Sequence, residues 1–176
     1  MTSPGRDKPI EILLLEGDAV ETELINKALT ESHIFYRLTV LADSEAALAF
    51  LQRRGPYEEA ARPDLILVDL DLPHNGGHAV LAAITGDPVL RVVRVLVLSS
   101  VPDAADILRK YGLPATAYIV KSNEGDPYLH VIKVLEDFWE SLEELLEGEG
   151  FLPEENGEDS NGHNGRTPRG VSRKGP

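Results

Sequence analysis

Residues 62–73 read RPDLILVDLDLP, and this stretch decides the fold class of the 176-residue chain. Its centre, residues 65–68, is uniformly apolar, which is typical of a strand covered on both faces in a parallel sheet. Asp69 and Asp71 follow directly, so carboxylates stand where this strand ends. In open α/β sheets, ligands bind beyond the carboxyl ends of the strands. The stretch therefore indicates an α/β protein with a polar site at one sheet edge.

Similar apolar segments recur on both sides of this stretch, and amphipathic segments separate them. Short apolar or alternating runs predict strands at 10–15, 36–41, 64–70, 92–98 and 117–120. Apolar residues at helical spacing predict helices at 19–32, 44–53, 79–84, 102–111 and 127–146, with 73–77 as a loop. Strand and helix alternate five times, which predicts a doubly wound parallel sheet with helices on both faces.

The C-terminal part of the chain differs from the rest in composition. Residues 151–176 contain four acids and four bases, so the net charge of −13 resides in residues 1–150. From residue 148 onward the chain is rich in Gly, Asn, Glu, Ser and Pro, and it has too few bulky apolar residues to offset chain entropy. We expect a folded domain at 8–147, closed by an extended helix, and a disordered polar tail at 148–176.

Composition also excludes several classes of function. The 30 acidic against 17 basic residues argue against nucleic acid and against an anionic membrane surface as partners. The chain has no cysteine, which excludes disulfides, thiolate metal sites and cysteine nucleophiles. No apolar run approaches the roughly 20 residues of a membrane helix, and the first residues lack the apolar segment of a signal peptide. We therefore expect a cytoplasmic protein.

Polar side chains follow four of the five predicted strands. They are Glu16-Gly17-Asp18, Asp69-Leu70-Asp71, Ser99-Ser100 and Lys121-Ser122. Clustered carboxylates repel one another unless a cation neutralises them, and oxygen ligands without cysteine favour Mg²⁺. A Lys and a small hydroxyl beside them suit an anion such as a phosphoryl group, which an aspartyl carboxylate can accept as a nucleophile.

Each of these residues also has an ordinary structural interpretation. A single Asp near a strand end is commonly a turn former, a Ser pair a helix cap, and a Lys a solvated surface residue. The functional hypothesis depends on their convergence at one edge of the predicted sheet.

The chain resembles the receiver domain of two-component response regulators, and most of all the single-domain regulators that partner bacterial phytochromes. The resemblance covers about residues 9–139 and is carried by IEILLLEGDAVETEL, YRLTVLADSEAALAFLQRRGPY, RPDLILVDLDLPHNGGHAVLAAI, VRVLVLSS, TAYIVKS and VIKVLEDFW. It implies a flavodoxin-like fold with strand order 2-1-3-4-5. It also implies phosphoryl transfer from a sensor histidine kinase, signalling through protein contacts, and no enzymatic activity beyond Mg²⁺-dependent self-phosphorylation and autodephosphorylation. Dimers through the last strand and helix are usual in this group, so we expect a homodimer.

The resemblance also assigns roles to individual residues. It places the phosphoacceptor on Asp69, the Lys that contacts the phosphoryl oxygens on Lys121, the switch hydroxyl on Ser99 and the switch aromatic on Tyr118. One position departs from the family pattern, because Ser122 follows the Lys where the family usually has Pro. That Pro commonly forms a cis bond that shapes the loop.

The metal site departs from the family pattern as well. The resemblance places Mg²⁺ on Glu16, Asp69 and the backbone carbonyl of Asp71. The family usually has an Asp that binds the metal directly at the position of Gly17. Asp18 and the side chain of Asp71 are candidate substitutes, although Asp18 and its neighbour at the strand end face opposite ways. Loss of a direct ligand or its support typically weakens metal affinity or activity about 10–100-fold.

Two other functions remain open. Gly17 and Ser122 support a degenerate pseudo-receiver, an interaction module that is not phosphorylated. The spacing Asp69-Leu70-Asp71 also fits a phosphatase of the haloacid-dehalogenase type. Such enzymes carry their nucleophile on the first strand, whereas here it lies on the third, and the chain lacks a cap insertion. The phosphorylated receiver is favoured because the chain has all four of its expected site residues, Asp69, Ser99, Tyr118 and Lys121.

Overall fold

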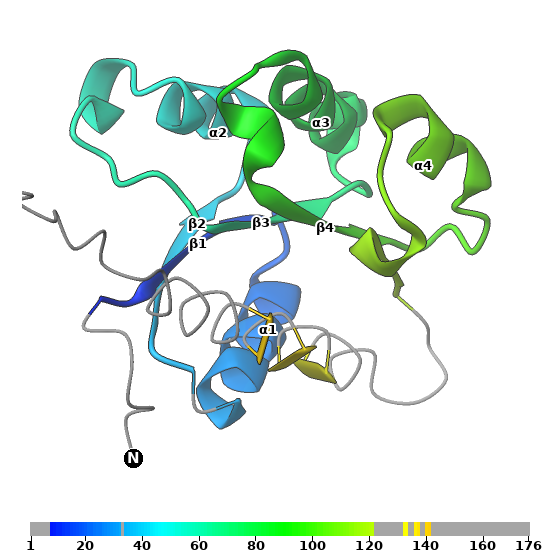
Figure 1. The fold of residues 1–176 in the computed structure, drawn as a ribbon, viewed down its shortest axis with the longest axis horizontal. Helices are drawn as coiled ribbons and strands as arrows, with labels where there is room; N and C mark the ends of the chain where they lie inside the picture. Colours follow the sequence, from blue (N-terminus) through cyan, green and yellow to red (C-terminus); the bar gives the residue numbers. More distant parts are fainter. Residues whose placement is uncertain (1–7, 33, 122–131, 134–135, 138–139, 142–176) are drawn as a thin grey trace, which may run out of the picture.

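Five parallel strands form one sheet in the order β2-β1-β3-β4-β5, which confirms the predicted doubly wound fold class and strand order (Figure 1). The computed structural model describes residues 8–32, 34–121, 132–133, 136–137 and 140–141. The strands are β1 (Ile10–Leu15), β2 (Tyr36–Leu41), β3 (Leu65–Asp69), β4 (Arg94–Ser99) and β5 (Tyr118–Val120). The helices are α1 (Ala19–Glu31), α2 (Ser44–Leu51), α3 (Gly76–Gly86) and α4 (Ala105–Tyr111).

Each face of the sheet carries its own apolar core. Figure 1 shows α1 on one side of the sheet and α2 and α3 on the other. Because side chains alternate along a strand, β1 serves both cores. Its residues Ile12 and Leu14 belong to the cluster that includes Ile25 of α1. Leu13 and Leu15 belong to the cluster formed with α2 and α3. Such a central strand needs apolar residues at the positions that face either core, and Glu11 is the one polar residue in β1.

Aspartate side chains begin the first two helices. The Oδ1 atom of Asp18 accepts hydrogen bonds from the backbone N–H groups of Val20 and Glu21, at 2.8 and 3.0 Å. Asp43 does the same for Ala46 at 2.8 Å. An aspartate in this position satisfies helix N–H groups that have no partner inside the helix. The Asp18 cap starts α1 directly after β1 and fixes Glu21 in its first turn.

The third helix begins earlier than predicted. A 3₁₀ turn at Pro73–Asn75 precedes it, and α3 starts at Gly76, so the prediction of a loop over 73–77 is wrong. A Cβ atom on Gly77 would overlap the backbone oxygen of Asp69. Only glycine therefore lets α3 start against the end of β3. Glycine lowers the expectation of a helix in a sequence pattern, which is why the pattern placed the helix start too late.

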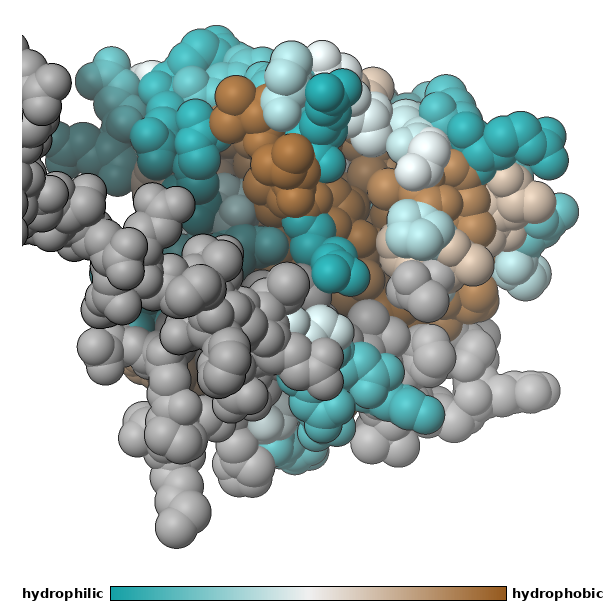
Figure 2. Space-filling model, viewed as in Figure 1, coloured by the Kyte–Doolittle hydropathy of each residue, from teal (hydrophilic) through white to brown (hydrophobic). Residues whose placement is uncertain are grey.

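The remaining boundaries shift by a few residues. The 3₁₀ turn Leu90–Val92 delays the start of β4. Figure 2 shows apolar surface over the segment that leads into β4, where Val89 and Val92 are exposed. Most of the predicted last helix, 127–146, and the whole tail, 148–176, lie outside the described residues. None of the helices in the described residues combines the length and the hydropathy that a membrane-spanning helix requires.

Candidate functional site

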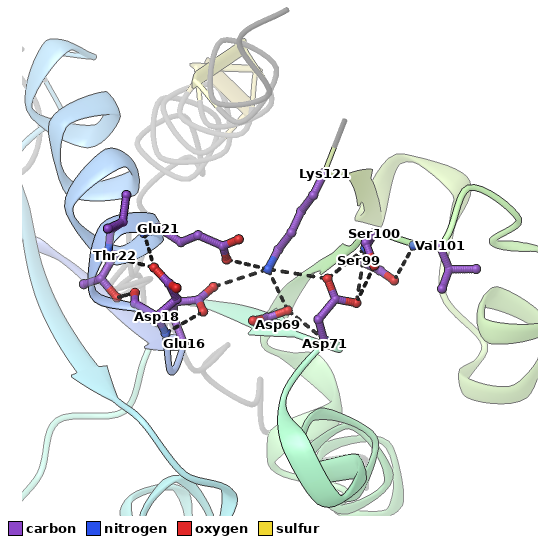
Figure 3. Close-up of polar contacts among 11 residues, drawn as sticks. Glu16, Asp18, Glu21, Thr22, Asp69, Asp71, Ser99, Ser100, Val101 and Lys121 are labelled. Atoms are coloured by element: carbon purple, nitrogen blue, oxygen red, sulfur yellow. Dashed lines mark hydrogen bonds and ion pairs between the residues drawn. The ribbon is translucent and has the colours of Figure 1, made fainter. Parts of the chain in front are cut away.

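The predicted site residues meet at the carboxyl edge of the sheet. Glu16 follows β1, Asp69 ends β3, Ser99 ends β4, and Lys121 follows β5. The backbone N–H of Lys121 donates to the carbonyl of Ser99 at 2.8 Å, which holds the Lys in line with its neighbouring strand. Figure 3 shows the Lys121 side chain pointing into a group of carboxylates. The topology thus brings together residues that lie up to about a hundred positions apart in the chain.

Four carboxylates surround the ammonium group of Lys121. Its Nζ atom lies 2.6 Å from Glu21 Oε2 and 2.8 Å from Asp69 Oδ1. It lies 3.6 Å from Glu16 Oε2 and 3.7 Å from Asp71 Oδ2. The Lys121 side chain is only 15% exposed. Partial burial weakens the screening of these charges by solvent. The Coulomb attraction between Lys121 and the carboxylates is therefore stronger than in an ion pair on an open surface.

Burial and neighbouring charges raise the pKa values of both Glu16 and Lys121, which favours the neutral form of Glu16 and the charged form of Lys121. Burial desolvates the Glu16 carboxylate and raises its pKa to about 8; the backbone N–H of Asp18 opposes this, while Asp69 and Glu21 add to it. Burial disfavours the charged form of Lys121, but its hydrogen bonds to Asp69 and Glu21 outweigh that effect and hold its pKa above the usual range. The site therefore holds more acid than one ammonium group can neutralise.

Glu16 has an oxygen that lacks a hydrogen bond. Glu16 is a buried residue, only 2% exposed. Its Oε1 atom accepts a hydrogen bond from the backbone N–H of Asp18 at 3.1 Å. Its Oε2 atom is buried and has no hydrogen-bond partner among the described residues. Such an atom is costly to bury; a proton retained by this carboxyl group, whose pKa is raised, or a bound cation would satisfy it.

The oxygens of the site fit a divalent cation. One carboxylate oxygen from each of Glu16, Glu21 and Asp69 lies within 4.8 Å of the others. Two oxygens on opposite sides of one such ion are about 4–5 Å apart, given metal–oxygen distances of about 2.0–2.6 Å. All three donors are hard oxygens, which suits Mg²⁺ or Mn²⁺. Glu21 was not predicted as part of the site, and only its place in the first turn of a helix after β1 hinted at it.

The other two acids predicted from the sequence, Asp18 and Asp71, use their carboxylates for hydrogen bonds to the backbone and to a neighbouring serine. The Asp18 carboxylate is exposed and caps α1, so it does not join the three-carboxylate group. The Asp71 carboxylate accepts hydrogen bonds from the backbone N–H of Ser100 at 3.0 Å and from its hydroxyl at 3.1 Å. The backbone N–H of Asp71 donates to Asp69 Oδ1 at 2.8 Å. The β3–α3 and β4–α4 connections are thereby joined beside the site.

The two expected switch residues hold the same backbone segment. Ser99 is 2% exposed, and its Oγ accepts a hydrogen bond from the N–H of Val101 at 3.1 Å. The hydroxyl of Tyr118 donates to the carbonyl of Val101 at 2.6 Å. Figure 3 shows Ser99 and Val101 beside Asp71. Hydrogen bonds from residues of two strands, β4 and β5, thus hold the segment that links β4 to α4.

Gly17, one of the two departures from the family pattern, lies close to Leu72 and Ala42. A Cβ atom on Gly17 would lie 3.1 Å from Leu72 Cδ2 and 3.6 Å from the carbonyl oxygen of Ala42. The Leu72 side chain therefore packs close to the place where a side chain on residue 17 would begin. Ser122 lies outside the described residues.

Comparison with known proteins gives consistent matches over most of the chain. Residues 12–133 match the family of the response regulator receiver domain. Response regulator Rcp1 from Synechocystis sp. is 37% identical over 137 residues, covering 78% of this chain and 93% of its own. Among solved structures, the phosphorylated cyanobacterial phytochrome response regulator RcpA has a TM-score of 0.67 and 37% identity, covering 77% of this chain and 96% of its own. The Mn²⁺-bound form of Rcp1 has a TM-score of 0.66 and 37% identity, covering 74% of this chain and 94% of its own.

A family match over residues 12–133, together with a relative of 37% identity over most of both chains, decides the family. The strand order and the acidic site described above agree with it. This chain belongs to the response regulator receiver domain family and is related to the phytochrome response regulators.

Proposed function

We propose that this receiver accepts a phosphoryl group on Asp69 from a phytochrome-like sensor histidine kinase and signals through protein–protein contacts. The observation that carries the proposal is the pairing of Asp69 with Lys121 at 2.8 Å inside a group of further carboxylates. The relationship to phytochrome response regulators supports the choice of kinase.

The transfer would use Asp69 as the nucleophile. A carboxylate oxygen of Asp69 attacks the phosphorus of a phosphohistidine, an O–P bond forms as the N–P bond breaks, and the electron pair returns to the imidazole nitrogen. With the other ring nitrogen protonated, the histidine leaves as neutral imidazole. The Lys121 ammonium group is placed to pair with the phosphoryl oxygens. Mg²⁺ held by Glu16, Asp69 and the Asp71 carbonyl would supply further positive charge beside these oxygens.

The response to phosphorylation would pass through Val101. The Ser99 hydroxyl, which now accepts the Val101 N–H at 3.1 Å, would turn to donate to the phosphoryl group. Tyr118, which holds the Val101 carbonyl at 2.6 Å, would shift with it. A local change of charge would in this way bias the position of the β4–α4 segment and of the α4 surface.

Mass spectrometry after incubation with a small phosphodonor and Mg²⁺ tests the proposal. We expect the mass to increase by one phosphoryl group in the wild type and in Asp106→Asn, a matched control on an exposed side chain of α4. We expect no increase in Asp69→Asn. The proposal is wrong if the wild type gains no mass, or if Asp69→Asn gains as much as the wild type.

The packing at Gly17 favours a second candidate, a receiver that binds partners without being phosphorylated. Position 17 lacks the usual metal-binding side chain, and Leu72, 3.1 Å from where a Cβ on residue 17 would be, would have to shift by a few tenths of an ångström to admit one. This candidate predicts no Mg²⁺ binding by calorimetry at millimolar metal and partner binding that survives Asp69→Ala. The first proposal predicts the opposite result in both measurements.

A homodimer completes the proposal. It is expected through the face near β5 and the last helix, because such dimers are usual in the family that the sequence resembles. Light scattering over a concentration series tests it. A mass that stays at the value of 19.2 kDa for one chain at all concentrations would exclude the dimer.

A further inference from the structure

The first helix delivers a carboxylate to the site that the strand ends do not supply. Glu21 lies in the first turn of α1, and its Oε2 atom is 2.6 Å from Lys121 Nζ. Its side chain is 32% exposed, so it faces both the site and solvent. In Figure 3 it points from α1 toward Lys121, alongside Glu16. The Asp18 cap holds the turn that carries it.

The orphaned oxygen of Glu16 points to a ligand in the same place. The Glu16 side chain is 1% exposed, and Oε2 has no hydrogen-bond partner among the described residues. Its distance of 3.6 Å from Lys121 Nζ is too long for a hydrogen bond. The oxygens of Glu16, Glu21 and Asp69 nevertheless all lie within 4.8 Å of one another. The buried oxygen therefore lacks a partner within a group of donors that fits one cation.

Lys121 occupies the centre of this group as a single positive charge. Its Nζ contacts Glu21 at 2.6 Å and Asp69 at 2.8 Å. Metal ligation uses the ionised form of all three carboxylates; one ammonium group would then leave two negative charges unbalanced, which a divalent cation would neutralise. Lysine is a point charge on a flexible stem, so it can withdraw from Glu21 and still reach Asp69.

Position 17 does not supply a carboxylate, so a third carboxylate ligand has to come from another element such as α1. The chain has glycine there, and Leu72 lies 3.1 Å from where the Cβ atom would be. We propose that Glu21 is a direct ligand of the divalent cation and replaces the carboxylate that residue 17 lacks. This inference rests on the proposed function, since the cation would serve phosphoryl transfer to Asp69 in the same site.

A Mn²⁺ titration of the full chain, read by the electron paramagnetic resonance of free Mn²⁺, measures the contribution of Glu21. We expect Glu21→Gln to bind Mn²⁺ about 10–100-fold more weakly than the wild type. Glu23→Gln is the matched control, because Glu23 is an exposed residue of the same helix and the change of charge is identical. We expect it to bind within about twofold of the wild type. Equal affinity of Glu21→Gln and Glu23→Gln, or no saturable binding to the wild type, would overturn the inference.

A second comparison separates a ligand from a mere partner of Lys121. The same titration is made with Lys121→Gln and with Lys121→Gln/Glu21→Gln. A ligand role predicts that the loss caused by Glu21→Gln stays about tenfold or more without the ammonium group. If Glu21 acts only through Lys121, the loss disappears in this background, and the inference is wrong.

These outcomes are independent of phosphorylation. If binding of Mn²⁺ depends on Glu21 but Asp69 gains no phosphoryl group, the proposed function fails and the metal site stands. If Asp69 gains the phosphoryl group while Glu21→Gln keeps wild-type affinity for Mn²⁺, only the inference about Glu21 fails.

Discussion

The ends of β1 and β3 lie side by side in the sheet, yet they use their acids differently. After β1 the next helix starts at Ala19, so Asp18 is used as its cap and only Glu16 stays in the site. After β3 a 3₁₀ turn precedes α3, and both Asp69 and Asp71 face Lys121. The length of the connection before a helix thus decides whether a strand-end acid serves the site or the helix.

The largest effect should come from closing the space at the end of β3. Gly77→Ala would place a Cβ against the backbone oxygen of Asp69 and separate α3 from the strand. We expect a loss of about 1–3 kcal/mol in the free energy of unfolding, measured by urea denaturation. Gly86→Ala, at the other end of α3, has nothing within 4 Å of the new Cβ and should be neutral or slightly stabilising. Equal effects of the two changes would contradict the close packing at Gly77.

At the end of β1, Glu16 should make the stability of the metal-free protein depend on pH. Its pKa is raised from 4.5 to about 8 in the folded state, so the folded protein holds a proton that the unfolded chain releases. The stabilisation from this proton is complete below pH 4.5 and is lost as the pH rises through 8. Glu16→Gln removes this dependence.

Urea denaturation in a chelator at several pH values measures the Glu16 effect. The difference in stability between Glu16→Gln and the wild type should grow in favour of the variant by about 2 kcal/mol from pH 5 to about pH 6.5, and should go on growing up to pH 8. Saturating Mg²⁺ should stabilise the wild type and not the variant. A constant difference over this range of pH would contradict the raised pKa.

The cap that distinguishes the β1 end from the β3 end should have a moderate effect. Asp18→Ala removes the acceptor for the N–H groups of Val20 and Glu21. We expect a loss of about 1 kcal/mol in the free energy of unfolding. Asp18→Asn keeps the acceptor and should cost only a few tenths of a kcal/mol, so this pair separates the cap from the charge. If Asp18→Asn instead lost as much Mn²⁺ affinity as Asp69→Asn, Asp18 would be the substitute ligand after all.

The smallest change in stability should come from Gly17→Asp, which gives the end of β1 a second acid, as the end of β3 already has. Gly17→Asp requires Leu72 Cδ2 to move by a few tenths of an ångström from its distance of 3.1 Å, which we expect to cost about 0.5 kcal/mol or less. The added carboxylate should raise the affinity for Mn²⁺. In this background the loss of affinity caused by Glu21→Gln should shrink. An undiminished loss would mean that residues 17 and 21 do not serve the same ion.

The sequence was sufficient for those features that depend on short-range patterns. Largely apolar runs predicted β1, β3, β4 and β5, which are mostly buried. The alternating run YRLTVL predicted β2, which is only partly buried. The acids and Lys121 at the strand ends predicted the site, because parallel strands share one carboxyl edge. Glu21 was missed, since a helical pattern assigns such a residue to the solvent face. The side on which Glu21 lies depends on the angle at which α1 leaves the sheet, which no local pattern encodes.

The two hydrogen bonds that hold Val101 have a consequence for how a partner protein would recognise the state of this receiver. Its amide and carbonyl are held by Ser99 and Tyr118, while the residue as a whole is 53% exposed. The two anchors come from neighbouring strands, so displacement of either one tilts the same outward-facing methyl groups. A protein that docks on this valine would register the combined state of both strands through a single point of contact.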